Sequence, residues 1–319
     1  MSEQLIGEQV VAAELSGETD NPTPEEQRSG KRLNRRQLIV RRFLRNKTAV
    51  VGLVVFLLLA LLAIVGPYVT PWGWDQIDDS SFLSPPSASH WLGTTQEGRD
   101  VLALTIKGLS KSMLVGVLVA LLSTSMAALV GSVAAYFGMI VEKTLLWIID
   151  LLLVIPSFLI IAVISTGGPQ GAYSWLLLVL LLAAFGWMLT ARVVRSLTLA
   201  LKDLDYVQAA RFMSVPAPTI IVRHILPNIS SLLVVDATLN VGGAILGETG
   251  LSYFGFGIQP PDTSLGTLIA DGQSSATVFP WIFLSPAILL VIIVLSVNAI
   301  GDGLRDALDP NSGASGRAM

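Results

Sequence analysis

Three polar side chains inside long apolar runs are the first candidates for a chemical role in this sequence: Asp150, Asp236 and Asn240. An ionised group at the centre of a bilayer costs about 2.5–3.5 kcal/mol on insertion scales. Asp150 and Asp236 therefore need a polar partner or an aqueous cavity. Asn240 follows Asp236 by one helical turn and shares its face. The pair either lines a polar path, to which Asp150 is the third candidate, or forms a buried hydrogen bond between helices.

A fourth ionisable residue, Glu248, stands near the end of the same apolar run as Asp236. Gly250, Ser252, Gly255 and Gly257 follow it closely, so the chain after Glu248 need not stay helical. We expect Glu248 to hold an external gate loop instead of contacting a solute.

The composition restricts the elements that can position these residues. The chain has 319 residues, of which 52% are hydrophobic and 13% charged, whereas soluble domains carry about 25% charged residues. This composition argues against a soluble globular enzyme. The absence of cysteine excludes disulfides and thiolate metal sites, and two histidines leave little for haem or zinc. The few aromatic residues and basic patches do not indicate a nucleic-acid surface.

Apolar runs long enough to cross a membrane, about 20 residues each, predict an all-α polytopic membrane protein with six transmembrane helices. Pro156 and Pro286 lie well inside the third and sixth runs and are expected to kink them. The six runs span residues 48–68, 112–141, 144–165, 174–194, 229–250 and 272–301.

The distribution of basic residues predicts the orientation. Eight basic residues and no acidic one lie between Lys31 and Lys47, which assigns this stretch to the cytoplasm. Alternating the spans leaves only Arg99, Lys107 and Lys111 outside. Both termini are therefore expected in the cytoplasm, and the chain in the cell membrane as a multi-pass protein.

The domain organisation follows from these spans. Residues 1–30 form an acidic tail, expected to be disordered because 1–27 hold seven acidic residues and no Lys or Arg. A basic segment (31–47), the first span (48–68) and an external segment (69–111) follow. Residues 112–310 form the remaining five spans with a cytoplasmic loop at 195–228, and residues 311–319 form a C-terminal tail.

The cytoplasmic loop is expected to form two short helices around a turn. Residues 205–213 are good helix formers, 214–218 contain two prolines, and 219–226 continue until Pro227 stops the helix. The small side chains of Ala209 and Ala210 would let this pair accept a close partner surface. A plain connector between spans fits the physics equally well.

This loop resembles the "EAA" loop of binding-protein-dependent ABC importer permeases, whose pattern is E-A-A, three residues, G and a later L-P. Gln208-Ala209-Ala210 stands at E-A-A and Leu226-Pro227 at L-P. Gln208 replaces the usual Glu but keeps an amide for hydrogen bonding. Ser214 replaces the usual Gly, so the bend is expected from Pro216 and Pro218 instead.

Two further stretches resemble the dipeptide/oligopeptide group of these importers, and within it the C-type permease subunit. His90 to Val101 is similar to H-x-L-G-T-D-x-x-G-R-D-V, with Thr95 in place of the usual Asp. Residues 246–261 are similar to L-x-E-x-x-L-S-F-L-G-L-G-x-Q-P-P. The resemblance covers about residues 35–310 and implies the type I ABC importer permease fold.

The resemblance also implies the partners. No G-x-x-x-x-G-K-[ST] motif occurs in the sequence, so ATP and Mg²⁺ are assigned to two partner ATP-binding domains and the chain itself is expected to be neither an enzyme nor a cofactor carrier. A second, related B-type permease subunit, an extracytoplasmic substrate-binding protein and the lipid bilayer complete the expected surroundings. The implied cargo is a di- or oligopeptide.

The resemblance assigns candidate residues to coupling and to the external segment. The external segment is expected to be compact, with one of Arg99 and Asp100 anchoring it. The ATPase-coupling candidates are Gln208, Ala209, Ala210, Arg211, Ser214, Arg223, Leu226 and Pro227, and the external candidates are Glu248, Gly98, Arg99 and Asp100.

The sequence leaves another cargo of the same family open and argues against three other classes of membrane protein. A permease of the same family could carry another small solute, such as a nickel complex, glutathione or haem. An ion-coupled secondary transporter would show repeated halves with broken helices, and no clear internal repeat is present. A redox subunit would need His90 and His224 on one haem, but they are predicted on opposite sides of the membrane. The serine and zinc protease motifs are missing.

Overall fold

The computed structural model describes residues 35–168, 171 and 173–309. The chain divides into two units, Met1–Arg41 and Arg42–Met319, which are described separately. In the first unit, the described residues open helix α2 (Arg35–Arg45). The expected acidic tail 1–30 and C-terminal tail 311–319 lie outside the described residues. The remaining description concerns the second unit.

The described part of the second unit consists of helices joined by turns and contains no strand, which confirms the predicted all-α class. Two isolated bridges, Ile77 with Arg99 and Thr94 with Asp100, are its only β-type pairings. The helices are α3 (Lys47–Val69), α4 (Val101–Phe137), α5 (Met139–Val154), α6 (Ser157–Gly167), α7 (Ser174–Gly186), α8 (Met188–Lys202), α9 (Asp205–Phe212), α10 (Ala217–Ile220), the π-helical turn η2 (Ile221–Ile225), α11 (Leu226–Tyr253), α12 (Leu265–Gln273) and α13 (Pro280–Leu308).

Among the described residues, four helical stretches are long and apolar enough to cross a membrane: α3, α4, the run from α10 to α11, and α13. Two bent pairs pass the same test together. Helices α5 and α6 meet at 78°, and α7 and α8 at 43°. The predicted six spans are reached when each bent pair is counted as one span.

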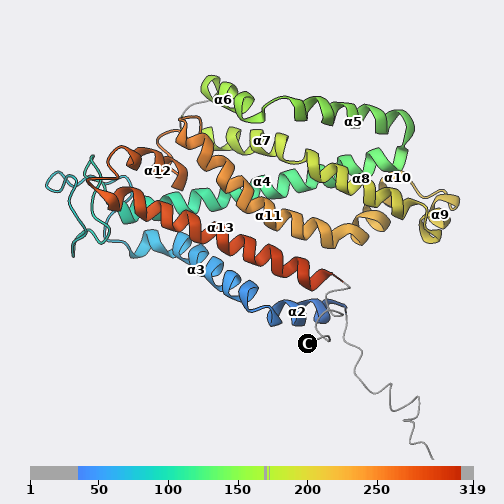
Figure 1. Ribbon diagram of the computed structural model, residues 1–319, viewed down its shortest axis with the longest axis horizontal. Helices are drawn as coiled ribbons and strands as arrows, with labels where there is room; N and C mark the ends of the chain where they lie inside the picture. Colours follow the sequence, from blue (N-terminus) through green and yellow to red (C-terminus); the bar gives the residue numbers. More distant parts are fainter. Residues whose placement is uncertain (1–34, 169–170, 172, 310–319) are drawn as a thin grey trace, which may run out of the picture. The chain divides into compact units, whose positions relative to one another are not determined.

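Helix α4 lies at the centre of the bundle, between α3 and α13 on one side and α7 and α8 on the other (Figure 1). Its buried positions are rich in small residues, which let membrane helices approach closely. At Gly131 an added Cβ would lie 2.4 Å from the Ala191 carbonyl oxygen of α8. The small residues buried along α4 include Gly116, Ala120, Ser123, Ala127, Gly131, Ser132 and Ala135.

The start of α4 differs from the prediction, which kept residues up to Lys111 in the external segment. The helix begins at Val101 because Asp100 caps it, its Oδ1 accepting from the Ala103 N–H at 2.8 Å. Lys107 and Lys111 thus lie on a helix. Their long side chains carry the charges out to Asp262, with Lys111 Nζ 2.8 Å from its carboxylate.

The prolines act differently from one another. Pro156 breaks the third span into α5 and α6, as the predicted kink requires, whereas Pro286 lies within the continuous helix α13. The prediction that Pro227 stops the preceding helix is wrong. The π-helical turn η2 precedes it, with the Leu226 N–H bonding to the Ile221 carbonyl. This wider turn makes room for the proline ring, and α11 continues to Tyr253.

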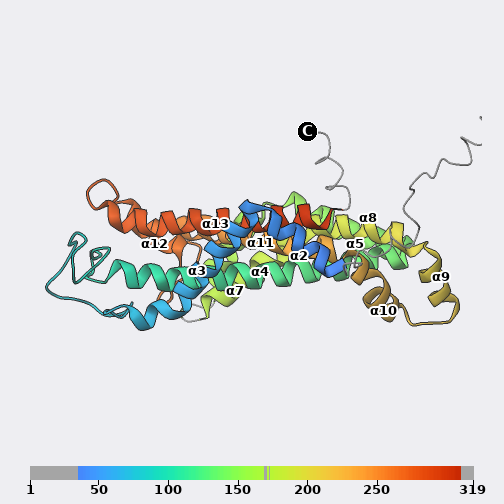
Figure 2. The same cartoon turned by 90° about the horizontal axis from the view of Figure 1, so that it is seen from below.

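The two ends of this bundle carry different connections. The segment 70–100 and α12 lie at one end, called here the α12 end, and α9 and α10 lie at the opposite end, called the α9 end (Figures 1 and 2). The candidate residues are therefore distributed over both ends and the helices between them.

Candidate functional site

The turn after α9 is a Schellman motif centred on Ser214. The Ser214 N–H donates to the Arg211 carbonyl at 3.0 Å, and the Val215 N–H donates to the Ala210 carbonyl at 3.1 Å. Ser214 has φ +57°, the left-handed conformation that favours glycine. The expectation that Pro216 and Pro218 supply the bend is therefore wrong. Ser214 itself makes the turn, and Pro216 instead caps the start of α10.

The two alanines of this loop differ in burial. Ala210 is buried with Val207 against Ile220, Ile221 and Ile225, so it packs inside the loop and cannot contact a partner as predicted. The physical reason is that α9 must bury one apolar stripe, and Ala210 lies on the same stripe as Val207. Ala209 is exposed.

Gln208 is half-buried, and its side-chain amide donates to the Lys202 carbonyl at 3.2 Å. Arg211, Arg223 and Pro227 are exposed, and Leu226 is half-buried. Gln208 therefore closes the loop on itself, while the two arginines face outward as expected.

Sequence reasoning missed the two most prominent apolar residues of the loop. Phe212 is 85% exposed and Met213 is 72% exposed. The available signal was a pair of large apolar residues at the end of a polar helix, directly before the turn position. Large exposed apolar groups of this kind mark interaction surfaces.

The inner face of the loop is packed onto three long helices. Val133 and Tyr136 of α4, Leu201 of α8 and Leu226 of α11 all pack against the cluster formed by Val207, Ala210, Ile220, Ile221 and Ile225. The inner face of the loop is therefore in contact with α4, α8 and α11 through this cluster.

Asp236 is the centre of a hydrogen-bond network between α11, α4 and α8. Thr124 Oγ1 donates to one carboxylate oxygen at 2.8 Å, and Thr190 Oγ1 donates to the other at 2.7 Å. The Asn240 side-chain amide donates to Asp236 at 2.9 Å, as the shared helical face indicated. Both carboxylate oxygens are therefore satisfied by side chains of three helices.

The structure does not bring Asp150 to this network. Asp150 of α5 instead forms an ion pair with Arg192 of α8, and Glu142 of α5 pairs in the same way with Arg195 of α8. Arg195 Nε lies 2.6 Å from Glu142 Oε1. These two pairs join α5 to α8, and Asp150 remains 60% exposed.

Glu248 is completely buried and accepts hydrogen bonds from serine hydroxyls. Ser252 Oγ and Ser264 Oγ both donate to its Oε1 at 2.6 Å, and Ser112 Oγ lies 3.5 Å from its Oε2. These serines come from α11, the residue before α12, and α4. Glu248 therefore lies next to the connection between α11 and α12, and its loop-holding role stays a prediction.

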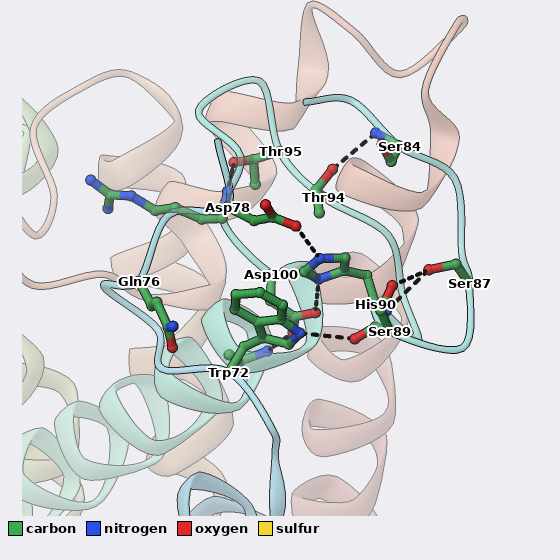
Figure 3. Close-up of polar contacts among 12 residues, drawn as sticks. Trp72, Gln76, Asp78, Ser84, Ser87, Ser89, His90, Thr94, Thr95 and Asp100 are labelled. Carbon is green, nitrogen blue, oxygen red and sulfur yellow. Dashed lines mark hydrogen bonds and ion pairs between the residues drawn. The ribbon is translucent and has the colours of Figure 1, made fainter. Parts of the chain in front are cut away.

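The segment 70–100 is built around His90, which is 1% exposed (Figure 3). Its Nδ1 is 2.9 Å from Asp100 Oδ2, its Nε2 is 3.2 Å from Asp78 Oδ2, and the Trp72 ring stacks on it at 4.6 Å between centroids. Hydrogen bonds from the Ser80 hydroxyl and N–H, with that from His90, lower the pKa of Asp78. The two ring nitrogens of His90 therefore link Asp78 to Asp100.

The predicted external candidates take separate places around this centre. Asp100 is buried between His90 and the start of α4, whereas Arg99 pairs with Glu97 at 3.2 Å. Gly98 has φ +72°, and an added Cβ would lie 2.6 Å from the Asp78 carbonyl oxygen. Asp100 is thus the residue that anchors the segment to the bundle. The role of His90 was missed, although its spacing of ten residues from an N-cap aspartate was visible.

A cleft of about 960 Å³ opens at the α12 end, between the segment 70–100 and the connection from α11 to α12. Glu97, Arg99, Asp262 and Asp271 are among its lining residues. Partial burial, together with the nearby Glu97 carboxylate, raises the pKa of Asp271. Across the described part of the chain, no group of three or more His, Cys, Asp or Glu residues could hold a metal ion.

Comparison with known proteins agrees with this arrangement. Residues 127–312 match the family described as binding-protein-dependent transport system inner membrane component, and residues 34–86 match the N-terminal TM domain of oligopeptide transport permease C. The chain is 53% identical to the oligopeptide transport system permease protein OppC of Mycobacterium bovis, over 88% of this chain and 96% of that protein. It is 34% identical to OppC of Bacillus subtilis, over 84% and 87%.

The first matched region includes the loop around α9 and the residues Asp150, Asp236, Asn240 and Glu248, whereas Gly98, Arg99 and Asp100 lie between the two matched regions. The length and apolarity of the helices are those of a multi-pass membrane protein. This chain belongs to the family of binding-protein-dependent transport system inner membrane components, as a C-type permease subunit of the dipeptide/oligopeptide group.

Proposed function

We propose that this chain is one of two permease subunits of an ATP-driven importer of di- or oligopeptides. The observation that carries the proposal is the 53% identity to an oligopeptide permease over nearly the full length of both chains. In this proposal, a related permease subunit completes the path, two ATP-binding domains supply the energy, and a substrate-binding protein delivers the peptide. The α9 end faces the cytoplasm and the α12 end faces outward, in keeping with the basic segment before α3.

The α9 loop is the coupling element in this proposal. Its outer face presents Ala209, Arg211, Phe212 and Met213, while its inner face is packed onto α4, α8 and α11. Closure of the ATP-binding domains would move the loop as a rigid lever, and those helices would follow it. Phe212 and Met213 are the apolar anchors of the contact, and Ala209 is the point of close approach.

The Asp236 network is assigned an interhelical role within the path. Its carboxylate oxygens are satisfied by Thr124, Thr190 and Asn240, so the group holds α4, α8 and α11 together in this conformation. The half-exposed Asp150–Arg192 pair needs water or a protein partner beside it, because lipid does not solvate an ion pair. We assign it to the cytoplasmic part of the aqueous path.

The coupling assignment is tested with Ala209→Trp in the complete complex. Overpacking a tight contact costs about 1–3 kcal/mol, which predicts a roughly tenfold or greater loss of ATPase co-purification, with the permease still in the membrane. Ala209→Ser is the matched control. Its side chain stays small, so both ATPase co-purification and membrane insertion of the permease should be unchanged. Phe212→Ala should also weaken co-purification. Normal assembly and uptake by Ala209→Trp would show that α9 does not form the contact with the ATP-binding domains.

The substrate assignment is tested by uptake into proteoliposomes that contain the permease pair and its ATPases, with binding protein and labelled peptide outside. Uptake should require ATP and be competed by unlabelled peptides. Competition by a nickel complex, glutathione or haem, without competition by peptides, would assign another cargo of the same family. Uptake by this chain alone, driven by an ion gradient, would reject the importer reading.

A further inference from the structure

Glu248 is a buried carboxylate that is satisfied by hydroxyl groups alone. Its exposed fraction is 0%, and no Lys, Arg or His of the described chain forms an ion pair with it. Burying such a group without partners would be very unfavourable. Its two hydrogen bonds of 2.6 Å, from Ser252 and Ser264, and its longer one from Ser112 offset that cost. Three separate parts of the chain are thereby fixed to one side chain.

Two of these serines also hold the first turn of α12. Ser264 caps the helix, its Oγ accepting from the Thr267 N–H at 3.1 Å, and Ser112 Oγ accepts from the Leu265 N–H at 3.1 Å. Each hydroxyl therefore connects an amide of α12 to the carboxylate. The positive end of the helix dipole also favours an acidic group at this place. Gly266 permits the approach, since an added Cβ would lie 2.7 Å from Thr249 Cα.

The residues between α11 and α12, 254–264, are called here the α11–α12 connection, and they cover several helix ends. Ser165 Oγ donates to the Phe256 carbonyl at 2.8 Å, and the Gln259 N–H donates to Ser174 Oγ at 3.2 Å, which joins the connection to α6 and α7. Ile258 is 2% exposed and packs in a cluster with residues of α4, α6 and α7. Asp262 pairs with Lys111 of α4 at 2.8 Å.

We propose that Glu248 is a positioning residue of the transport cycle. By fixing the start of α12 to α4 and α11, it holds the α11–α12 connection closed over the ends of α4, α6 and α7. Opening of the α12 end then moves α11 and α12 as one body. The inference rests on the permease role and is independent of which solute is carried.

The absence of cysteine from the chain allows a direct test. Ser174→Cys introduces a nearly isosteric thiol under the connection, where the serine is 7% exposed. Its rate of reaction with a small maleimide, in the purified full complex without substrate, reports how often the connection lifts. Ser132→Cys, at a serine that is 0% exposed on α4, reports general loosening of the bundle.

These reporters are combined with Glu248→Ala, Glu248→Gln and Ser264→Ala. Ser285→Ala is the matched control, because within the described part of the chain the Ser285 hydroxyl bonds only to the Trp281 carbonyl of its own helix. Losing buried hydrogen bonds is costly enough that the labelling of Cys at position 174 should rise by roughly tenfold or more in Glu248→Ala and Ser264→Ala. Labelling at position 132 should stay unchanged.

Glu248→Gln should restore slow labelling, since its amide can accept from Ser252 and Ser264 and donate to Ser112. If labelling became faster by the same factor at positions 174 and 132, Glu248 would have only a general stabilising role, and the proposal would be overturned. Labelling no faster than in Ser285→Ala, or Glu248→Gln behaving like Glu248→Ala, would also overturn it. Because no substrate is present, these outcomes are independent of whether peptide uptake is observed.

Discussion

Replacing Ser214 by glycine should make the loop around α9 more stable. Ser214 adopts φ +57° at the turn after α9, and a left-handed conformation costs an L-residue roughly 1–2 kcal/mol. Glycine removes this cost but gives up about 0.5–1 kcal/mol through its freedom in the unfolded chain. The Ser214 hydroxyl makes no hydrogen bond within the described residues, so its loss adds little. The expected net gain is about 0.5–1 kcal/mol.

Hydrogen exchange of the loop measures this gain. The Ser214 and Val215 amides donate to Arg211 and Ala210, so they exchange only when the turn opens. A gain of about 0.5–1 kcal/mol corresponds to exchange slowed by about two- to fivefold at these positions. Mass spectrometry of a peptide covering α9 and α10, taken from the intact complex, gives the comparison with the unsubstituted chain.

The matched control is Thr219→Gly, a glycine placed within helix α10. There the substitution adds flexibility without relieving strain, and exchange should become faster. Unchanged or faster exchange in Ser214→Gly would show that the turn is not held in the left-handed conformation, and the Schellman assignment would fail with it.

Three further predictions follow from the same structure. Gly131→Ala should lower the melting temperature of the purified protein, because its Cβ would lie 2.4 Å from the Ala191 carbonyl oxygen, at a cost of about 1–3 kcal/mol; Gly243→Ala, where no atom lies within 4 Å, should not. Asp271 has a raised pKa, so its stabilising contribution is complete below its ordinary value of 3.8 and is lost as the pH rises through the raised one. Asp271→Asn should therefore raise the melting temperature near pH 7, with a difference that shrinks toward pH 4; an equal gain at both pH values would contradict the burial argument. Tags at either terminus should resist protease added outside intact cells, and their cleavage would reverse the proposed orientation.

The sequence by itself determined the spans and the short-range pairing. Apolar runs such as 48–68 fixed α3 almost to the residue, because a bilayer rewards about 20 apolar residues wherever they occur. The bond between Asp236 and Asn240 followed from helical spacing alone. The loop around α9 was located by its break at residues 214–218, since turn chemistry is also a local property.

Tertiary structure decided which face of each element is covered. Ala209 and Ala210 are adjacent and identical, yet only Ala210 is buried, because α9 turns that side toward Ile220, Ile221 and Ile225. Glu248 contacts Ser264, which follows it by 16 residues, and Ser112, which precedes it by 136 residues. No local sequence pattern relates those positions. Pro156 breaks a span, whereas Pro227 does not, because a π-helical turn precedes it. Periodicity reports only the neighbours along one helix, and partners that are distant in sequence become fixed when helices pack.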